Sequence, residues 1–117
     1  MKITSWNARG LNSPSKKRIL KQHLTNFNSD IILLQETKLS LDEGSKLARS
    51  LGLWQVVFLE ARGASGGLGI IWNPKKVDVF SMEHNYNWMS VIVHSLKLDL
   101  KFVLFHSYGP VSYSGKR

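Results

Sequence analysis

The spacing of apolar residues along the first part of the chain predicts a strand followed by a helix. Residues 2–7 alternate, with Ile3 and Asn7 on one face, and this period of two is typical of a strand. The stretch "NSPSKKRILKQHLTNFN" repeats its apolar positions at helical spacing, and Ser13 and Pro14 suit the N-cap and the first helical position. Its apolar stripe consists of Ile19, Leu20, His23, Leu24 and Phe27.

The spacing of apolar residues further along the chain predicts a strand, a second helix and then a run of strands. "DIILLQ" is typical of a buried strand, and "DEGSKLARSLG" of a short helix that ends near Gly52. The strands that follow are "WQVVFLEA", "LGIIW", "KVDVFSM", "WMSVIVHS" and "LKFVLFHSY". A strand–helix–strand start predicts a right-handed crossover between parallel neighbours, and the later strands predict antiparallel hairpins. We therefore expect one α/β (α+β) domain over residues 1–117, with a mixed sheet that carries its helices on one face.

Composition limits the class of protein. A chain of 117 residues that is 43% apolar has enough material for one small core. No apolar run approaches the roughly 20 residues that span a bilayer, so no membrane partner is expected. The absence of Cys excludes disulfides and thiolate metal sites, and it suits an intracellular protein.

The formal net charge of +8 favours a polyanionic partner, with nucleic acid first. The alternative is a fragment whose acidic residues lie elsewhere. Basic residues crowd the early turns of the first helix, where they oppose the helix dipole. They can contact phosphate or serve nuclear import, or they can form a solvated face. These residues are Lys16, Lys17, Arg18 and Lys21.

Polar side chains stand where the first two strands end. Asn7 closes the first strand, and Gln35 and Glu36 close the second. The carboxyl ends of parallel strands share one edge of the sheet, which is where α/β sheets bind ligands. Glu36 suits Mg²⁺, which accepts one or two carboxylates plus water and phosphate, and Asn7 can steady the carboxylate. The alternative is a pair of polar strand ends that face water.

Two other segments invite interpretation. "RGASGGLGIIW" lacks the Lys-Ser/Thr ending of a phosphate loop, so Gly66 and Gly67 indicate a hairpin turn or a close backbone approach. His106 and Tyr108 emerge near the end of the last apolar strand, where a phenol can hydrogen-bond phosphate. The alternative for such a tyrosine is a structural role beside a turn. Gln35 and His106 are auxiliary candidates.

Four of these segments together resemble a known family. "SWNARGLNSP", "DIILLQETK", "GASGGLGIIWN" and "SYGPVSYSGKR" follow one another as in the endonuclease/exonuclease/phosphatase superfamily. The chain is most similar to the endonuclease domain of plant LINE-type (non-LTR) retrotransposons, which is in turn similar to apurinic/apyrimidinic endonucleases. The resemblance implies a four-layer α/β/β/α sandwich and a Mg²⁺-dependent phosphodiesterase that acts on DNA. It also implies that Asn7 and Tyr108 serve catalysis and that Glu36 is the metal ligand.

The chain departs from the family pattern in two places. Related elements read Asn-Val-Tyr where this sequence has His106, Ser107 and Tyr108. The family's Gly-Asp-x-Asn and Asp-His motifs do not follow before Arg117, so the chain resembles the N-terminal half of the domain. We expect little nuclease activity from it alone, with self-association through an exposed sheet face. The alternatives are a non-catalytic nucleic-acid-binding module and a degenerate remnant without a selected role.

Overall fold

The computed structural model describes residues 1–26, 28–62, 66–85, 87–107 and 112–113, the last two without their side chains, and it forms two β-sheets and two helices. The elements are β1 (Ile3–Asn7), α1 (Pro14–Asn26), β2 (Ile31–Gln35), α2 (Leu41–Ser50), β3 (Gln55–Leu59), β4 (Leu68–Trp72), β5 (Val77–Asn85), β6 (Trp88–Ser95), β7 (Leu100–Ser107) and β8 (Ser112–Tyr113). The predicted order of strands and helices is confirmed.

The first sheet has the strand order β1-β2-β4-β3, and the second has the order β5-β6-β7-β8. β1 precedes α1 in the chain and β2 follows it. The two strands pair in parallel, as the strand–helix–strand pattern predicted. β4 is antiparallel to both β2 and β3, so the first sheet is mixed. The second sheet is antiparallel throughout, with an irregularity in β5 between Phe80 and Glu83.

Local chemistry explains where the helices begin. The Ser13 hydroxyl accepts a hydrogen bond from the backbone N–H of Lys16 at 3.3 Å, which confirms Ser13 as the N-cap of α1. α2 begins at a capping box, in which Ser40 and Glu43 each bond the backbone N–H of the other. Leu20 and Leu24 of the predicted stripe are buried, but Ile19 is 38% exposed, so its inclusion in the stripe was wrong. Ile19 precedes Leu20 by about 100° of helical turn, which moves it off the buried face. Phe27 lies outside the described residues.

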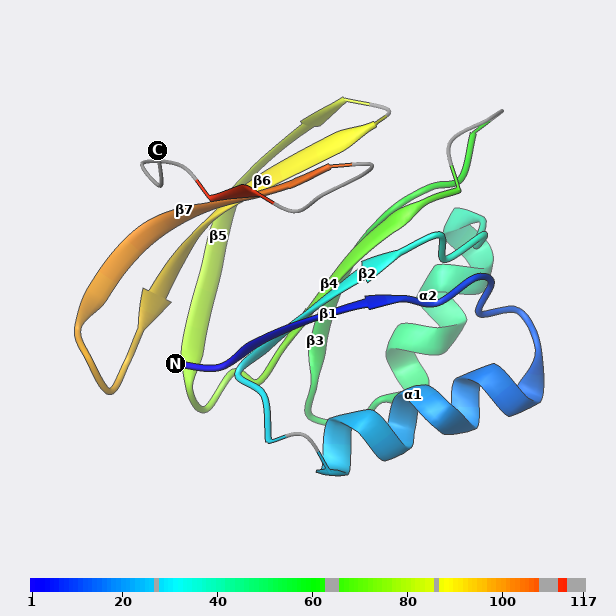
Figure 1. Cartoon of the computed structure of the whole chain (residues 1–117), viewed down its shortest axis with the longest axis horizontal. Coiled ribbons are helices and arrows are strands. Elements are labelled where there is room, and N and C mark those ends of the chain that lie inside the picture. Colours follow the sequence, from blue (N-terminus) through cyan, green and yellow to red (C-terminus); the bar gives the residue numbers. More distant parts are fainter. Residues whose placement is uncertain (27, 63–65, 86, 108–111, 114–117) are drawn as a thin grey trace.

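The side chains form two cores, one on each face of the first sheet. Between the two sheets, residues such as Ile31, Leu33 and Ile70 pack against Met89 and Leu104. On the other face, Leu34 and Ile71 pack under residues of α1 and α2. β2 and β4 are therefore buried on both sides, which is why "IILL" and "LGIIW" are continuous apolar runs. The described residues form an α/β/β arrangement of three layers (Figure 1), consistent with part of an α/β sandwich.

The second sheet carries an apolar row on its outer face. Phe80, Ile92 and Val103 are successive cross-strand partners, and Phe80 and Val103 are 42% and 41% exposed. Trp88 and Phe105 stack on each other with ring centroids 5.1 Å apart. The inner faces of the two sheets cover each other, so the exposed apolar row lies on the outer face of the second sheet, and self-association through it stays a prediction. In the part of the chain that is described, neither helix has the length and apolar character to span a bilayer.

Candidate metal centre

The candidate site lies where β1 and β2 end side by side. Asn7 and Gln35 are register partners, and the next backbone N–H, that of Ala8, donates to the Gln35 carbonyl at 2.9 Å. The parallel pairing continues past the strands, because the Gly10 N–H donates to the Glu36 carbonyl at 2.7 Å. Asn7 and Glu36 are thus brought to one edge of the sheet, as their positions in the sequence predicted.

Asn7 and Glu36 contact each other directly. The Asn7 side-chain Nδ2 donates a hydrogen bond to Glu36 Oε2. The Asn7 Oδ1 accepts from the backbone N–H of Arg9 at 3.1 Å, so both ends of the amide are engaged. The Asn7 amide nitrogen thus contacts the carboxylate, and the amide oxygen, which has two lone pairs, accepts one hydrogen bond from the backbone. The structure therefore places the Asn7 amide against the Glu36 carboxylate, at the ends of β1 and β2.

Left-handed backbone geometry is concentrated at this edge. Glu36, Lys38 and Arg9 are non-glycine residues with φ values of 52°, 55° and 51°. Each such residue costs on the order of 1 kcal/mol and persists where surrounding contacts impose it. Here the hydrogen bond from Gly10 N–H to the Glu36 carbonyl provides such a contact. The left-handed conformation of Glu36 and Lys38 turns the chain after β2. The Glu36 side chain lies half-buried beside Asn7.

The β3–β4 hairpin supports the Glu36 segment from its other side. The Gly66 carbonyl accepts from Lys38 N–H at 2.6 Å, and the Gly67 carbonyl accepts from Thr37 N–H at 3.3 Å. A Cβ on Gly66 would lie 3.2 Å from the Cα of Glu36, so a side chain there crowds the candidate ligand. This confirms that the glycines serve a hairpin and a close backbone approach. The predicted role of "RGASGG" in its middle, residues 63–65, lies outside the described residues.

The oxygen chemistry of the site fits Mg²⁺, and it would limit how tightly such an ion could be held. Glu36 offers a carboxylate at the strand ends, which is the hard oxygen donor that Mg²⁺ prefers. Within the described ranges, no group of three or more His, Cys, Asp or Glu side chains is arranged to hold a metal. One carboxylate suits an ion that keeps most of its waters and shares a substrate phosphate.

His106 does not emerge from the strand end, which corrects the sequence interpretation. Its side chain points between the sheets from β7 and is fully buried. Its Nε2–H donates to the Leu34 carbonyl of β2 at 2.8 Å, and within the described residues its Nδ1 has no hydrogen-bond partner. Burial lowers the pKa of the imidazole below its ordinary value of 6.5, outweighing the bond to Leu34, which raises it. His106 is therefore a neutral link between the two sheets. Tyr108 lies outside the described residues.

The depressed pKa of His106 predicts pH-dependent stability. The unfolded chain takes up a proton near pH 6.5 and the folded chain only at lower pH, so stability falls as pH drops below about 6.5. The slope contributed by His106 is at most about 1.4 kcal/mol per pH unit. Urea denaturation at several pH values measures it.

His106→Gln is the matched variant, since Gln keeps an N–H donor and does not titrate. We expect this variant to have a flatter stability profile than the wild-type protein between neutral and mildly acidic pH. Parallel profiles for the two proteins would show that His106 is not the group responsible.

The basic cluster of α1 is divided between different surroundings. The Lys16 ammonium donates to the carbonyl of Ala8 at 2.7 Å, which places it beside the strand-end site. Lys17 lies near α2, where its charge helps to lower the pKa of the Glu43 carboxyl after the larger effect of the Ser40 backbone and hydroxyl. Arg18 and Lys21 are exposed. A nucleic-acid contact by these four residues stays a prediction.

Two cations beside the site were missed from the sequence. Arg9 and Lys38 each follow a strand end by two or three residues and are exposed. Arg9 donates its backbone N–H to Asn7, and Lys38 donates its own to Gly66. Their positions just after "WN" and "QET" are the signal that identifies them, because they share the turns that carry the site residues.

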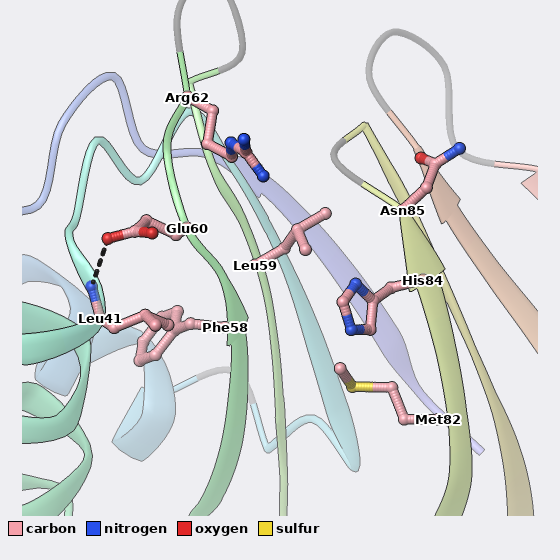
Figure 2. Close-up of a pocket in the computed structure, with 8 residues that line it drawn as sticks. All are labelled: Leu41, Phe58, Leu59, Glu60, Arg62, Met82, His84 and Asn85. Carbon is pink, nitrogen blue, oxygen red and sulfur yellow. Dashed lines mark hydrogen bonds between the residues drawn. The ribbon is translucent and has the colours of Figure 1, made fainter.

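A separate hollow of about 500 Å³ lies between the edge strands β3 and β5 (Figure 2). Its walls are mainly apolar and include Phe58, Leu59 and Met82, and Glu60 bonds the backbone N–H of Leu41 at 3.2 Å. Arg62, His84 and Asn85 stand on its polar side. This hollow was not predicted from the sequence, because its two walls come from different sheets. Neither Asn7 nor Glu36 lines this hollow, so it is distinct from the candidate metal centre.

The two packed sheets, the helices on one outer face and the carboxylate–amide pair at the strand ends define an α/β sandwich with a candidate metal centre. The family model described as Endonuclease/Exonuclease/phosphatase family matches residues 4–113. The chain therefore belongs to the endonuclease/exonuclease/phosphatase family.

Three solved structures illustrate the similarity in fold. Danio rerio TDP2 complexed with single-strand DNA product has a TM-score of 0.71 at 21% identity, over 97% of this chain and 47% of that one. The APE2 catalytic domain of Xenopus laevis has a TM-score of 0.67 at 21% identity, over 99% of this chain and 47% of that one. The AP endonuclease LMAP of Leishmania major has a TM-score of 0.66 at 18% identity, over 91% of this chain and 39% of that one.

These structures show that the fold is shared, and the chain spans less than half the length of each of the three. No curated protein sequence matches the chain.

Proposed function

We propose that this chain supplies the metal-binding part of a Mg²⁺-dependent phosphodiesterase that acts on DNA. The observation that carries the proposal is the Asn7–Glu36 hydrogen bond at the carboxyl ends of β1 and β2. Membership of the endonuclease/exonuclease/phosphatase family supports it. The similar TDP2 structure, complexed with single-strand DNA product, supports DNA as the substrate.

In this proposal, each residue at the strand ends has a separate role. Glu36 holds the ion, and Asn7 keeps the carboxylate oriented by donating to Oε2 while its own oxygen is fixed by Arg9 N–H. A bound Mg²⁺ supplies Lewis acidity toward a phosphate oxygen. Lys16 lies beside the same strand ends through its bond to Ala8 and adds positive charge for an approaching phosphate. The family resemblance assigns Tyr108 to the scissile phosphate region.

The proposal includes low activity for the 117-residue chain alone. Phosphodiester hydrolysis needs a metal, a base that activates water and a group that stabilises the developing charge. Glu36 supplies the first function through one carboxylate, and Asn7 only orients it. Members of a catalytic set act as a unit, so a partial set loses orders of magnitude in rate.

The proposed metal centre is tested by paramagnetic line broadening with Mn²⁺, which takes the same oxygen ligands as Mg²⁺. In NMR spectra of the labelled chain we expect Mn²⁺ to broaden the amide signals of Asn7, Gly10, Glu36 and Thr37 first. Excess Mg²⁺ should restore these signals, with affinities on the order of millimolar for a single-carboxylate site. Broadening centred on other residues, or broadening that Mg²⁺ does not reverse, would contradict the proposal.

A second candidate is a non-catalytic nucleic-acid-binding module, favoured by the net charge of +8. Its binding would weaken steeply with salt and would not depend on Mg²⁺ or on Glu36. The carboxylate–amide pair favours the metal-dependent function. We also propose an origin in a plant LINE-type retrotransposon, from the four sequence segments quoted above. From this resemblance and the net charge of +8 we propose a nuclear location. A fluorescent fusion of the chain tests the location.

A further inference from the structure

A basic hollow lies at the end of the sandwich away from Glu36. It has a volume of about 610 Å³, and we call it the distal basic hollow. Its lining residues are Met1, Lys2, Asn28, Asp30, Lys75, Lys76, Ser95 and Lys97. Four of these side chains are lysines and one is an aspartate, so the hollow carries a surplus of positive charge.

The fold builds this hollow from four segments that are far apart in the sequence. The Lys2 carbonyl accepts from Asp30 N–H at 2.9 Å, and the Asp30 carbonyl accepts from Asn73 N–H at 3.0 Å. Next to the β5–β6 ladder of the second sheet, the Lys76 carbonyl accepts from Leu96 N–H at 3.0 Å. The start of β1, the α1–β2 connection, the β4–β5 turn and the β6–β7 turn are therefore tied together by backbone hydrogen bonds. The lysines stand on a framework that is already ordered.

The single carboxylate does not cancel this charge. Asp30 lies 3.6 Å from the Lys76 ammonium, which also donates to Asn28 Oδ1 at 3.1 Å. Lys75 and Lys97 are exposed, and neither belongs to an ion pair among the described residues. After Asp30 is matched with Lys76, the ammonium groups of Lys75 and Lys97 still add positive charge around the hollow. Ammonium groups of this kind bind phosphate as point charges.

The hollow is separated from the candidate metal centre by the length of the strands. Lys2 precedes β1 and Asn7 ends it, and five residues of strand extend about 17 Å. Asp30 and Glu36 flank β2 in the same way. In Figure 1 the N-terminus and the β4–β5 turn lie at the opposite end of the sheets from the segment after β2. A phosphate in the hollow is therefore not the phosphate at Glu36.

We propose that the distal basic hollow binds the phosphate backbone of a nucleic acid, as a contact separate from the one at the strand-end site. The inference goes beyond the proposed function, because it concerns a different surface and requires no metal. Several lysines around one open hollow match successive phosphates of a strand, and the net charge of +8 favours such a partner.

The test is the binding of a short fluorescein-labelled DNA duplex, measured by anisotropy over a range of salt concentrations in EDTA. Lys75→Gln/Lys97→Gln removes two charges from the hollow. We expect the slope of log K against log salt to become shallower by about 1.8, since each lost phosphate contact contributes about 0.9. At moderate salt the affinity should fall at least several-fold. Because no metal is present, the result does not depend on whether Glu36 forms a metal centre.

Two further variants control for net charge and for side-chain chemistry. Lys46→Gln/Arg49→Gln removes two exposed charges from α2, away from the hollow, and should change the slope by much less. Lys75→Arg/Lys97→Arg keeps the charge and should keep the affinity. Equal losses in the two Gln variants, or a loss in the Arg variant as large as in its Gln counterpart, would overturn the proposal.

NMR of the wild-type chain keeps the proposal falsifiable even if a variant folds poorly. The same unlabelled duplex should shift the amide signals of Lys2, Lys75, Lys76 and Lys97. Unshifted signals at these positions would overturn the proposal. Full displacement of the duplex by a comparable concentration of inorganic phosphate would also overturn it, because the hollow would then be a small-anion site.

Discussion

Replacing Gly67 by alanine is expected to lower the free energy of unfolding by about 2–4 kcal/mol. Gly67 has a φ of +89°, which an alanine adopts only with strain. An added Cβ would lie 2.5 Å from the Thr37 hydroxyl oxygen and 3.3 Å from two backbone atoms, Ala61 N and the Leu59 carbonyl oxygen. Thr37 is buried and cannot move away without loosening the segment that follows Glu36. Urea denaturation of the two proteins measures the loss.

Gly52→Ala is the matched control for this variant. Gly52 also has a left-handed backbone, with a φ of +67°, but no atom lies within 4 Å of an added Cβ. It should therefore show only the conformational cost, about 1 kcal/mol. If the two variants lose the same stability, the close approach of the β3–β4 hairpin to Thr37 contributes nothing, and the steric part of the argument is wrong.

The Glu36→Gln variant is expected to lose metal binding almost completely. The substitution keeps the size of the side chain and removes the carboxylate that holds the ion. The Mn²⁺ broadening at Asn7, Gly10 and Thr37 should disappear at metal concentrations that saturate the wild-type chain. We expect Asn7→Ala, which removes only the group that orients Glu36, to weaken binding by about 10–100-fold.

Glu83→Gln is the control for the loss of one negative charge, because Glu83 is exposed on β5 in the other sheet. It should bind Mn²⁺ as the wild-type chain does. A plasmid-nicking assay with Mg²⁺ adds a second readout, in which we expect all these proteins to remain near background. Strong nicking that Glu36→Gln abolishes would contradict the expected low activity of the 117-residue chain while supporting the metal centre. Retained broadening in Glu36→Gln would place the ion elsewhere.

The candidate site was predicted from the sequence because its residues follow directly from strand order. Asn7 ends one strand and Glu36 follows the next, and a helix between them makes the strands parallel neighbours. The order of strands and helices determines the path of the backbone, and so it also determines which residues stand at a strand end. It does not determine where the His106 side chain points, because a histidine near a strand end can point either toward solvent or between the sheets.

For the basic residues, too, the sequence predicted a cluster, but the structure decided where each side chain lies. Lys16, Lys17, Arg18 and Lys21 lie close together in the sequence, yet the Lys16 ammonium bonds the Ala8 carbonyl, while Arg18 and Lys21 are exposed. The lysines of the distal basic hollow are spread from position 2 to position 97 and meet only because four segments are joined at one end of the sandwich. Proximity in the sequence predicted the basic cluster of α1, but it could not predict the distal basic hollow.

The sequence by itself determined the order of strands and helices, the buried character of β2, and the meeting of Asn7 with the Glu36 segment. These features depend on local periodicity and on the short connection between neighbouring parallel strands. Only the tertiary structure decided the Asn7–Glu36 hydrogen bond, the link from His106 to Leu34, and the gathering of lysines at the far end. The reason is physical: each of these depends on how two sheets and their turns pack, and that packing is set by contacts between residues distant in the chain.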